Sequence, residues 1–283
     1  MAEPQELTIA TPTLRIAARV HGPDDAPVVV ALHGWLDNAG SFDLLAPRLE
    51  GLRIIALDLP GHGESEHLPP GATYLFLDLV ALVHAATVAL GLERFMLLGH
   101  SLGAAISSTL AGTFPDRIER VALIEGLGPV TEPMRDLPER FAKALTAEAD
   151  KKGKAPSVHE TIDAAVDRLV QATALPRQAA RIIAPRGLRA VEGGVTWRAD
   201  PRLRLPSRMR LAEDAVLAFL RRIACPVLVV RGSKGSPFAP RAASERLAAL
   251  GDARLVEAPG GHHVHLEAPA ECAAVIGPFL RGA

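Results

Sequence analysis

Length, composition and charge place the chain among ordinary globular proteins. Its 283 residues suffice for one large domain with an insertion, and 48% of them are hydrophobic against 22% charged. The net charge of −1 gives no field that would attract nucleic acid or a membrane surface, so neither is an expected partner. The first residues lack the pattern of a signal peptide, and the only thiols are Cys225 and Cys272; we therefore expect a cytoplasmic protein whose cysteines are buried and unpaired.

Short apolar runs alternate along the chain with segments of helical periodicity. This alternation is typical of a mostly parallel sheet covered by helices, an α/β fold. Eight strands are expected, the first two as an antiparallel hairpin: 7–11, 14–20, 28–32, 53–57, 95–98, 121–124, 227–230 and 254–257. The clearest helices are expected at 75–90, 102–114 and 241–250.

The regular alternation stops between the sixth and seventh expected strands. The interval shows helical periodicity, several prolines and no clear strand, which indicates a helical cap inserted into the sheet domain. We expect the cap at 127–210 and the sheet domain at 1–126 and 211–283.

The strongest local motif is Gly99-His100-Ser101-Leu102-Gly103, which follows an apolar strand and precedes a helix. In this setting Gly-x-Ser-x-Gly predicts a nucleophile elbow, a turn so sharp that side chains at the two glycines would collide with backbone. The N-terminus of the following helix favours negative charge on an attacked carbonyl oxygen. The alternative is a serine that merely caps a helix, but the strand-turn-helix setting favours Ser101 as a nucleophile.

A serine hydroxyl needs a histidine base and a carboxylate that orients the histidine. His262 follows the last strand, in a loop that returns to the edge of the sheet beside Ser101; His263 and His265 are close competitors. A histidine-rich loop is also an alternative metal site, but no Asp or Cys cluster accompanies it in the sequence, so we expect neither metal nor cofactor. Structural roles are expected for His33, His62 and His100.

Several motifs resemble those of the α/β-hydrolase fold 1 superfamily. They are His33-Gly34-Trp35, the run from Asp58 to Ser65, the elbow itself, and a Gly-His pair with Glu267 five residues beyond His262. The segments 34–38, 123–129 and 197–203 are similar to those of the serine hydrolase-like group. The resemblance implies an oxyanion hole formed by the main-chain N–H groups of Leu102 and Trp35, and it carries His262 over as the base.

The acid departs from the commonest pattern of that superfamily. An aspartate usually follows the seventh strand, but the loop 231–240 holds no carboxylate. The superfamily has a second solution, seen in some haloalkane dehalogenases, with the acid at the end of the sixth strand, where this chain has Glu125. A charge at the end of an apolar strand is costly without a partner, so we interpret Glu125 as the acid rather than as an edge residue satisfied by solvent or an arginine.

These residues predict a carboxylesterase-like serine hydrolase that acts on small to medium esters through an acyl-enzyme. A serine nucleophile disfavours dehalogenase and epoxide hydrolase chemistry, which use a carboxylate nucleophile. Amide or carbon–carbon bond hydrolysis on the same triad stays open, as does a ligand-binding protein without catalysis. We expect a monomer or homodimer.

Trp35, His100 and Trp197 are the expected substrate contacts, and Trp197 and Met209 either line an apolar pocket or pack within the cap. The second half of the cap is rich in arginine, with only Glu192 and Asp200 opposing. Either these arginines form a solvated face or they bind an anionic substrate group. The arginines are Arg177, Arg181, Arg186, Arg189, Arg198, Arg202, Arg204, Arg208 and Arg210.

Overall fold

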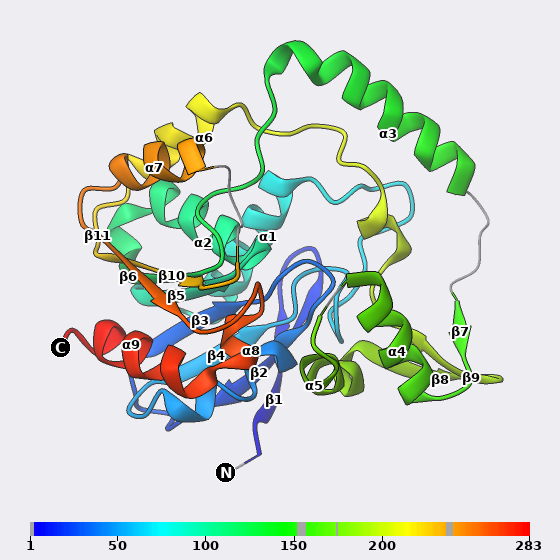
Figure 1. Ribbon diagram of the computed structural model, residues 1–283, viewed down its shortest axis with the longest axis horizontal. Coiled ribbons are helices and arrows are strands. Elements are labelled where there is room, and N and C mark those ends of the chain that lie inside the picture. The colour runs from blue at the N-terminus through cyan, green and yellow to red at the C-terminus, as the bar shows by residue number, and fades with distance from the viewer. Residues whose placement is uncertain (1–2, 152–156, 174, 236–239) are drawn as a thin grey trace.

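The computed structural model describes residues 3–151, 157–173, 175–235 and 240–283. An eight-stranded sheet forms its centre and confirms the expected α/β-hydrolase architecture (Figure 1). Its order is β1-β2-β4-β3-β5-β6-β10-β11, antiparallel at β1–β2 and β2–β4 and parallel beyond. The strands are β1 Gln5–Ala10, β2 Arg15–His21, β3 Val28–Leu32, β4 Arg53–Leu57, β5 Phe95–His100, β6 Ile118–Ile124, β10 Val227–Gly232 and β11 Ala253–Ala258.

Helices cover both faces of this sheet because its central strands are apolar on both sides. Two clusters of buried apolar side chains, one on each face, form the core. On one face lie α1 Phe76–Ala89, α2 Leu102–Thr113, α6 Glu213–Leu220 and α7 Pro240–Ala248, and on the other lie α8 Val264–Glu267 and α9 Pro269–Arg281 (Figure 1). Short 3-10 helices are η1 Ala39–Phe42, η2 Ala46–Arg48, η3 Pro115–Arg117, η4 Met134–Asp136 and η5 Pro201–Arg204.

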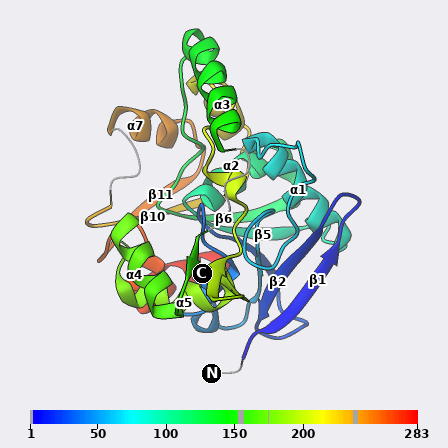
Figure 2. The ribbon, with the colours of Figure 1, turned by 90° about the vertical axis from the view of Figure 1, so that its right-hand side faces the viewer.

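The segment between β6 and β10, where the sequence predicts a helical cap, is an insertion between two neighbouring strands of the sheet, and it is not purely helical. It contains an antiparallel three-stranded sheet of order β7-β9-β8, where the sequence indicated no strand. Helix α3 projects from the body of the molecule, whereas α4, α5 and the small sheet lie beside the central sheet domain (Figures 1 and 2). The elements are α3 Leu137–Lys151, β7 Val158–His159, α4 Ile162–Thr173, α5 Arg177–Gly187, β8 Leu188–Val191 and β9 Gly194–Trp197.

A buried ion pair joins the insertion to the sheet domain. The Arg186 side chain of α5 is 2% exposed, and its Nε donates to Asp58 Oδ2 at 2.8 Å. Its Nη1 also donates to both carboxylate oxygens of Glu6, at 2.8 and 2.9 Å. Burial raises the pKa of Asp58, and the Arg186 charge opposes that rise. Because each buried charge relies on its partner, this contact fixes α5 against the sheet.

Parallel pairing brings the ends of β3, β5, β6 and β10 to one edge of the sheet. Leu32 pairs with Gly99, His100 with Ile124, and Ile124 with Val230. Ser101 and Glu125, which directly follow β5 and β6, therefore lie at the same edge and line one pocket. Cys225 and Cys272 are free and buried, as expected, and no helix in the described ranges is long and apolar enough to cross a membrane.

Candidate active site

Ser101 occupies a strained turn between β5 and α2. Its backbone has φ 51° and ψ −110°, a conformation that L-residues rarely adopt. The turn depends on two close approaches: a Cβ at Gly99 would lie 2.4 Å from the carbonyl oxygen of Gly103, and one at Gly103 would lie 1.9 Å from that of Leu32. The two glycines therefore permit the elbow that the motif predicts.

Three side chains predicted from distant parts of the sequence meet at this turn. His262 Nε2 lies 2.9 Å from Ser101 Oγ, and His262 Nδ1 lies 3.1 Å from Glu125 Oε2. The carboxylate can only accept, so Nδ1 carries the hydrogen and Nε2 presents its lone pair to the serine hydroxyl. This arrangement suits transfer of the serine proton to the imidazole.

Glu125 follows β6 directly and is held in place by its backbone and by its second carboxylate oxygen. Its φ is 51°, and its main-chain N–H donates to the carbonyl oxygen of Val230 at 2.9 Å. The N–H of Gly232 donates to Oε1 at 2.6 Å, which leaves Oε2 for His262. The carboxylate is fully buried, and a Cβ at Gly235 would lie 2.4 Å from Oε1. Of the loop 231–240, residues 236–239 lie outside the described residues.

The two residues whose main-chain N–H groups are the predicted oxyanion hole, Leu102 and Trp35, line the same pocket as Ser101. Leu102 is the first residue of α2, and Trp35 lies in the loop after β3. Within the described part of the chain, neither main-chain N–H donates to an acceptor. Leu36 beside Trp35 has φ 64°, which is strained for leucine. The two N–H groups are thus available to an incoming oxygen.

Ser101 and His262 open onto a pocket of about 600 Å³. One wall is apolar and comes from the segment that leads into α1, including Tyr74 and Phe76. The opposite wall belongs to the insertion, from Arg202 to Leu211. Met209 lines this wall, so of its two expected roles, lining a pocket or packing within the cap, the structure shows the first. The pocket is large enough for a small to medium substrate.

The three expected substrate contacts are placed differently. Trp35 lines the pocket; the residue is 53% exposed, and its indole N–H donates to the carbonyl oxygen of Leu203 at 3.0 Å. His100 and Trp197 are not among the lining residues. His100 is the last residue of β5, and its side chain is 1% exposed. The ring faces Asp37 and does not face the pocket. Trp197 ends β9 and packs against the core of the insertion.

The arginine-rich segment divides into paired and unpaired side chains. Arg177 and Arg181 pair with Asp163, and Arg186 is the buried anchor, so these three are structural. Four others line the pocket: Arg202, Arg204, Arg208 and Arg210. Of these, Arg202 pairs with Asp200 and Arg208 with Glu148.

Arg204 and Arg210 differ from the other arginines of the pocket. Among the described residues neither has an ion-pair or hydrogen-bond partner. Desolvation lowers the pKa of Arg204, although both arginines are exposed to solvent. Both guanidinium groups are therefore available to an anion in the pocket, since each lacks an internal partner.

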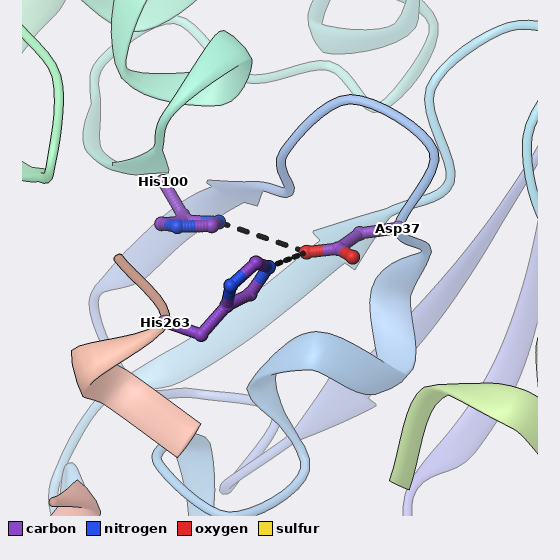
Figure 3. A group of neighbouring side chains, drawn as sticks. All are labelled: Asp37, His100 and His263. Carbon is purple, nitrogen blue, oxygen red and sulfur yellow. Dashed lines mark ion pairs between the residues drawn. The ribbon is translucent and has the colours of Figure 1, made fainter. Parts of the chain in front are cut away.

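A histidine cluster lies behind the catalytic residues, and the sequence did not indicate its acidic member. Asp37 Oδ2 is 3.4 Å from His263 Nε2 and 3.7 Å from His100 Nδ1, with both rings turned toward the same oxygen (Figure 3). The sequence shows no Asp or Cys cluster beside the histidine-rich loop, but in the folded chain one aspartate, Asp37, lies next to it. His263 and His265, the competitors of His262, face Asp37 and Ser41 rather than Ser101.

Comparison with known proteins agrees with this architecture. The family model for the alpha/beta hydrolase fold matches residues 27–269. A probable serine hydrolase of Drosophila melanogaster is 34% identical over 99% of this chain and 88% of its own. A pimeloyl-[acyl-carrier protein] methyl ester esterase of Chromobacterium violaceum is 30% identical over 86% of this chain and 87% of its own. The crystal structure of a hypothetical protein from Pseudomonas aeruginosa superposes with a TM-score of 0.92 at 43% identity, covering 99% of this chain and 100% of that one.

Proposed function

The chain belongs to the alpha/beta hydrolase fold family, and from that premise we propose that it is a carboxylesterase-like serine hydrolase acting through an acyl-enzyme on Ser101. The observation that carries this proposal is the hydrogen-bonded series from Glu125 through His262 to Ser101, with separations of 3.1 and 2.9 Å, beside a pocket of about 600 Å³. Its relatives include a serine hydrolase and an ester-cleaving enzyme, which supports hydrolase activity.

The proposed reaction begins with proton transfer. As Ser101 Oγ attacks the ester carbonyl carbon, His262 Nε2 takes the hydroxyl proton, and Glu125 stabilises the resulting imidazolium. The carbonyl oxygen becomes an oxyanion that the N–H groups of Leu102 and Trp35 hold. The tetrahedral intermediate then collapses: the carbon–oxygen bond to the alcohol breaks, and His262 returns the proton to the departing alkoxide.

Water completes the cycle. His262 takes a proton from a water molecule, whose oxygen attacks the acyl carbon of the Ser101 ester. Collapse releases the carboxylic acid and returns a proton to the serine oxygen. Glu125 keeps one imidazole orientation through both halves, because Gly232 fixes its other oxygen at 2.6 Å.

We assign substrate selection to the cap, residues 127–210, and catalysis to residues 1–126 and 211–283. The cap provides the arginines of the pocket and part of its apolar lining, whereas the sheet domain provides the catalytic side chains and the rest of the apolar lining. This division agrees with the general separation of a rigid catalytic frame from the loops that shape a pocket.

The unpaired arginines of the cap favour an ester whose acyl or alcohol part bears a carboxylate. Among the described residues, Arg204 lines the pocket without an acidic partner, so its guanidinium is free to form charge-assisted hydrogen bonds with an anion. Arg210 adds a second positive charge on the same wall. An ester with a free carboxylate at its far end fits this distribution of charge.

A paired set of esters tests both parts of the proposal. The wild-type chain should hydrolyse p-nitrophenyl esters, with Ser101→Ala as the inactive control. Arg204→Gln should lower kcat/KM for a carboxylate-bearing ester by roughly 10-fold or more, the effect of losing one charge-assisted hydrogen bond, and should leave the neutral ester unchanged. Arg177→Gln, an exposed cap arginine outside the pocket, is the matched control. Equal loss for both esters in Arg204→Gln would contradict anion recognition.

A further inference from the structure

We propose that Asp37, His100 and His263 form a binding site for one divalent transition-metal ion, with Zn²⁺ as the best fit. The site lies behind the catalytic residues and is separate from the substrate pocket, because none of its three side chains lines that pocket. The proposal does not depend on which bond the active site cleaves.

The ligand atoms already stand at spacings near those of a coordination sphere. One atom from each of the three residues lies within 4.8 Å of the other two. Asp37 Oδ2 is 3.4 Å from His263 Nε2 and 3.7 Å from His100 Nδ1 (Figure 3). Tetrahedral Zn²⁺ with bonds of about 2.0–2.1 Å places its ligand atoms about 3.3 Å apart. The two distances from Asp37 nearly match this spacing, whereas the two histidine nitrogens, which lie within 4.8 Å of each other, would have to move closer by up to about 1.5 Å.

The tautomer of His100 leaves a lone pair aimed at the carboxylate. His100 Nε2 lies 2.8 Å from the carbonyl oxygen of His262, which only accepts, so Nε2 carries the hydrogen. The other ring nitrogen of the neutral imidazole, Nδ1, then presents its lone pair toward Asp37. This Nδ1 is buried without a hydrogen-bond partner, and 3.7 Å from Asp37 Oδ2 is too long for such a bond.

Two electron-rich atoms that face each other in a buried place are costly unless a positive group lies between them. Without a metal, a hydrogen on His263 Nε2 points toward Asp37 Oδ2, which lies 3.4 Å from that nitrogen. This hydrogen does not compensate the lone pair of His100 Nδ1. A divalent cation would engage all three atoms at once. Space for it is kept by Gly34, where a Cβ would lie 2.8 Å from His100 Nδ1 and 3.4 Å from Asp37 Oδ2.

The chemistry of the ligands selects the metal. Two imidazoles and one carboxylate suit Zn²⁺ and its neighbours rather than Ca²⁺ or Mg²⁺, which prefer oxygen. Ser41 supports the carboxylate, since its Oγ donates to Asp37 Oδ2 at 3.2 Å and stands 2.8 Å from His265 Nε2. The His263 side chain is 18% exposed, whereas those of Asp37 and His100 are 6% and 1% exposed, so the cluster is nearest to solvent at His263.

A metal here would join the three segments that carry the active site. Asp37 lies in the loop after β3, His100 ends β5 beside the nucleophile, and His263 follows the catalytic base. Binding would therefore stabilise the whole fold by mass action. At a free Zn²⁺ concentration about 100 times Kd, we expect Tm to rise by about 5 °C.

Calorimetric titration of the chelator-treated full chain with ZnCl₂ tests the proposal. We expect one ion per chain, and Asp37→Asn and His263→Gln should each weaken binding by roughly 10-fold or more. Co²⁺ should give the visible absorption of a four-coordinate site in the wild type and lose it in both variants. These readouts do not rely on catalytic activity.

The control is His262→Ala, which removes the neighbouring histidine that lies outside the cluster. It should retain the metal, whereas an ion bound between the catalytic base and Ser101 would be lost. The absence of saturable Zn²⁺ binding in the wild type would overturn the proposal. Loss of binding in His262→Ala together with full binding in His263→Gln would also overturn it, because the ion would then lie in the active site.

Discussion

Replacing Glu125 by glutamine is the most informative perturbation of the active site. The buried carboxylate accepts from the Gly232 N–H at 2.6 Å and from His262 Nδ1 at 3.1 Å. A glutamine fills the same space but has only one acceptor oxygen. If that oxygen stays with Gly232, the amide NH₂ faces His262 and favours the tautomer whose hydrogen is on Nε2, which cannot take the Ser101 proton.

The expected loss follows from this wrong tautomer and from the missing charge opposite the imidazolium. Turnover should fall roughly 10²- to 10⁴-fold, by analogy with loss of an orienting acid. This equals about 3–5 kcal/mol in the activation barrier. The fold should be retained, because glutamine has nearly the volume of glutamate, and circular dichroism would check it.

The assay is steady-state hydrolysis of a p-nitrophenyl ester by the two proteins. Glu148→Gln is the matched control, since it removes another carboxylate of the same pocket, one that pairs with Arg208 and not with His262. This control should change turnover far less than Glu125→Gln. Near-normal turnover in Glu125→Gln would refute the assignment of Glu125, as would equal losses in both variants.

Two further predictions concern stability. Burial lowers the pKa of His33 to about 4 and of His62 to about 3, from 6.5. The unfolded chain therefore binds protons that the folded chain does not, so stability should fall as the pH drops from about 7.5 to about 5, by roughly 2 kcal/mol for each histidine. Urea unfolding at both pH values measures this, and an undiminished pH slope in His62→Gln would contradict it. In the second prediction, Arg186→Gln leaves the buried Asp58 carboxylate without its charge partner and should cost roughly 3–5 kcal/mol. The exposed Arg189→Gln should cost little, and equal unfolding free energies for the two variants would contradict the buried anchor.

The parts of the site that the sequence predicts are those that immediately follow strands. Ser101 and Glu125 directly follow β5 and β6, and parallel pairing brings the ends of neighbouring strands to one edge. His262 lies four residues beyond the end of β11, in a loop that returns to the same edge. The strand pattern and the turn motif predict Ser101 and the position of His262, whereas Glu125 is assigned as the acid from the resemblance to the superfamily. The roles of all three stay proposals.

The small sheet of the cap escaped prediction because its strands are short. β7 has two residues, and β8 and β9 have four each, too few for a clear alternation of polar and apolar residues. A signal was present, since Gly193 has φ 81° and begins a Gly-Gly pair between two runs that contain valine, a pattern typical of a hairpin.

The histidine cluster could not be predicted because its geometry depends on side-chain direction. His100 is adjacent to Ser101 in sequence, but successive residues around the turn point to different sides, so its ring lies behind the nucleophile. Asp37 reaches it from the loop after β3, whose path is set by packing rather than by a strand. Nothing in the sequence relates Asp37 to His263.

The most direct test of the account is the mass of the chain after reaction with a fluorophosphonate. The intact wild-type protein should gain one adduct, and peptide analysis should locate it on Ser101. Ser101→Ala should gain none, and His262→Ala should react far more slowly because no base takes the hydroxyl proton. A native chain that stays unlabelled, or an adduct that persists in Ser101→Ala, would contradict the assignment of Ser101 as the nucleophile.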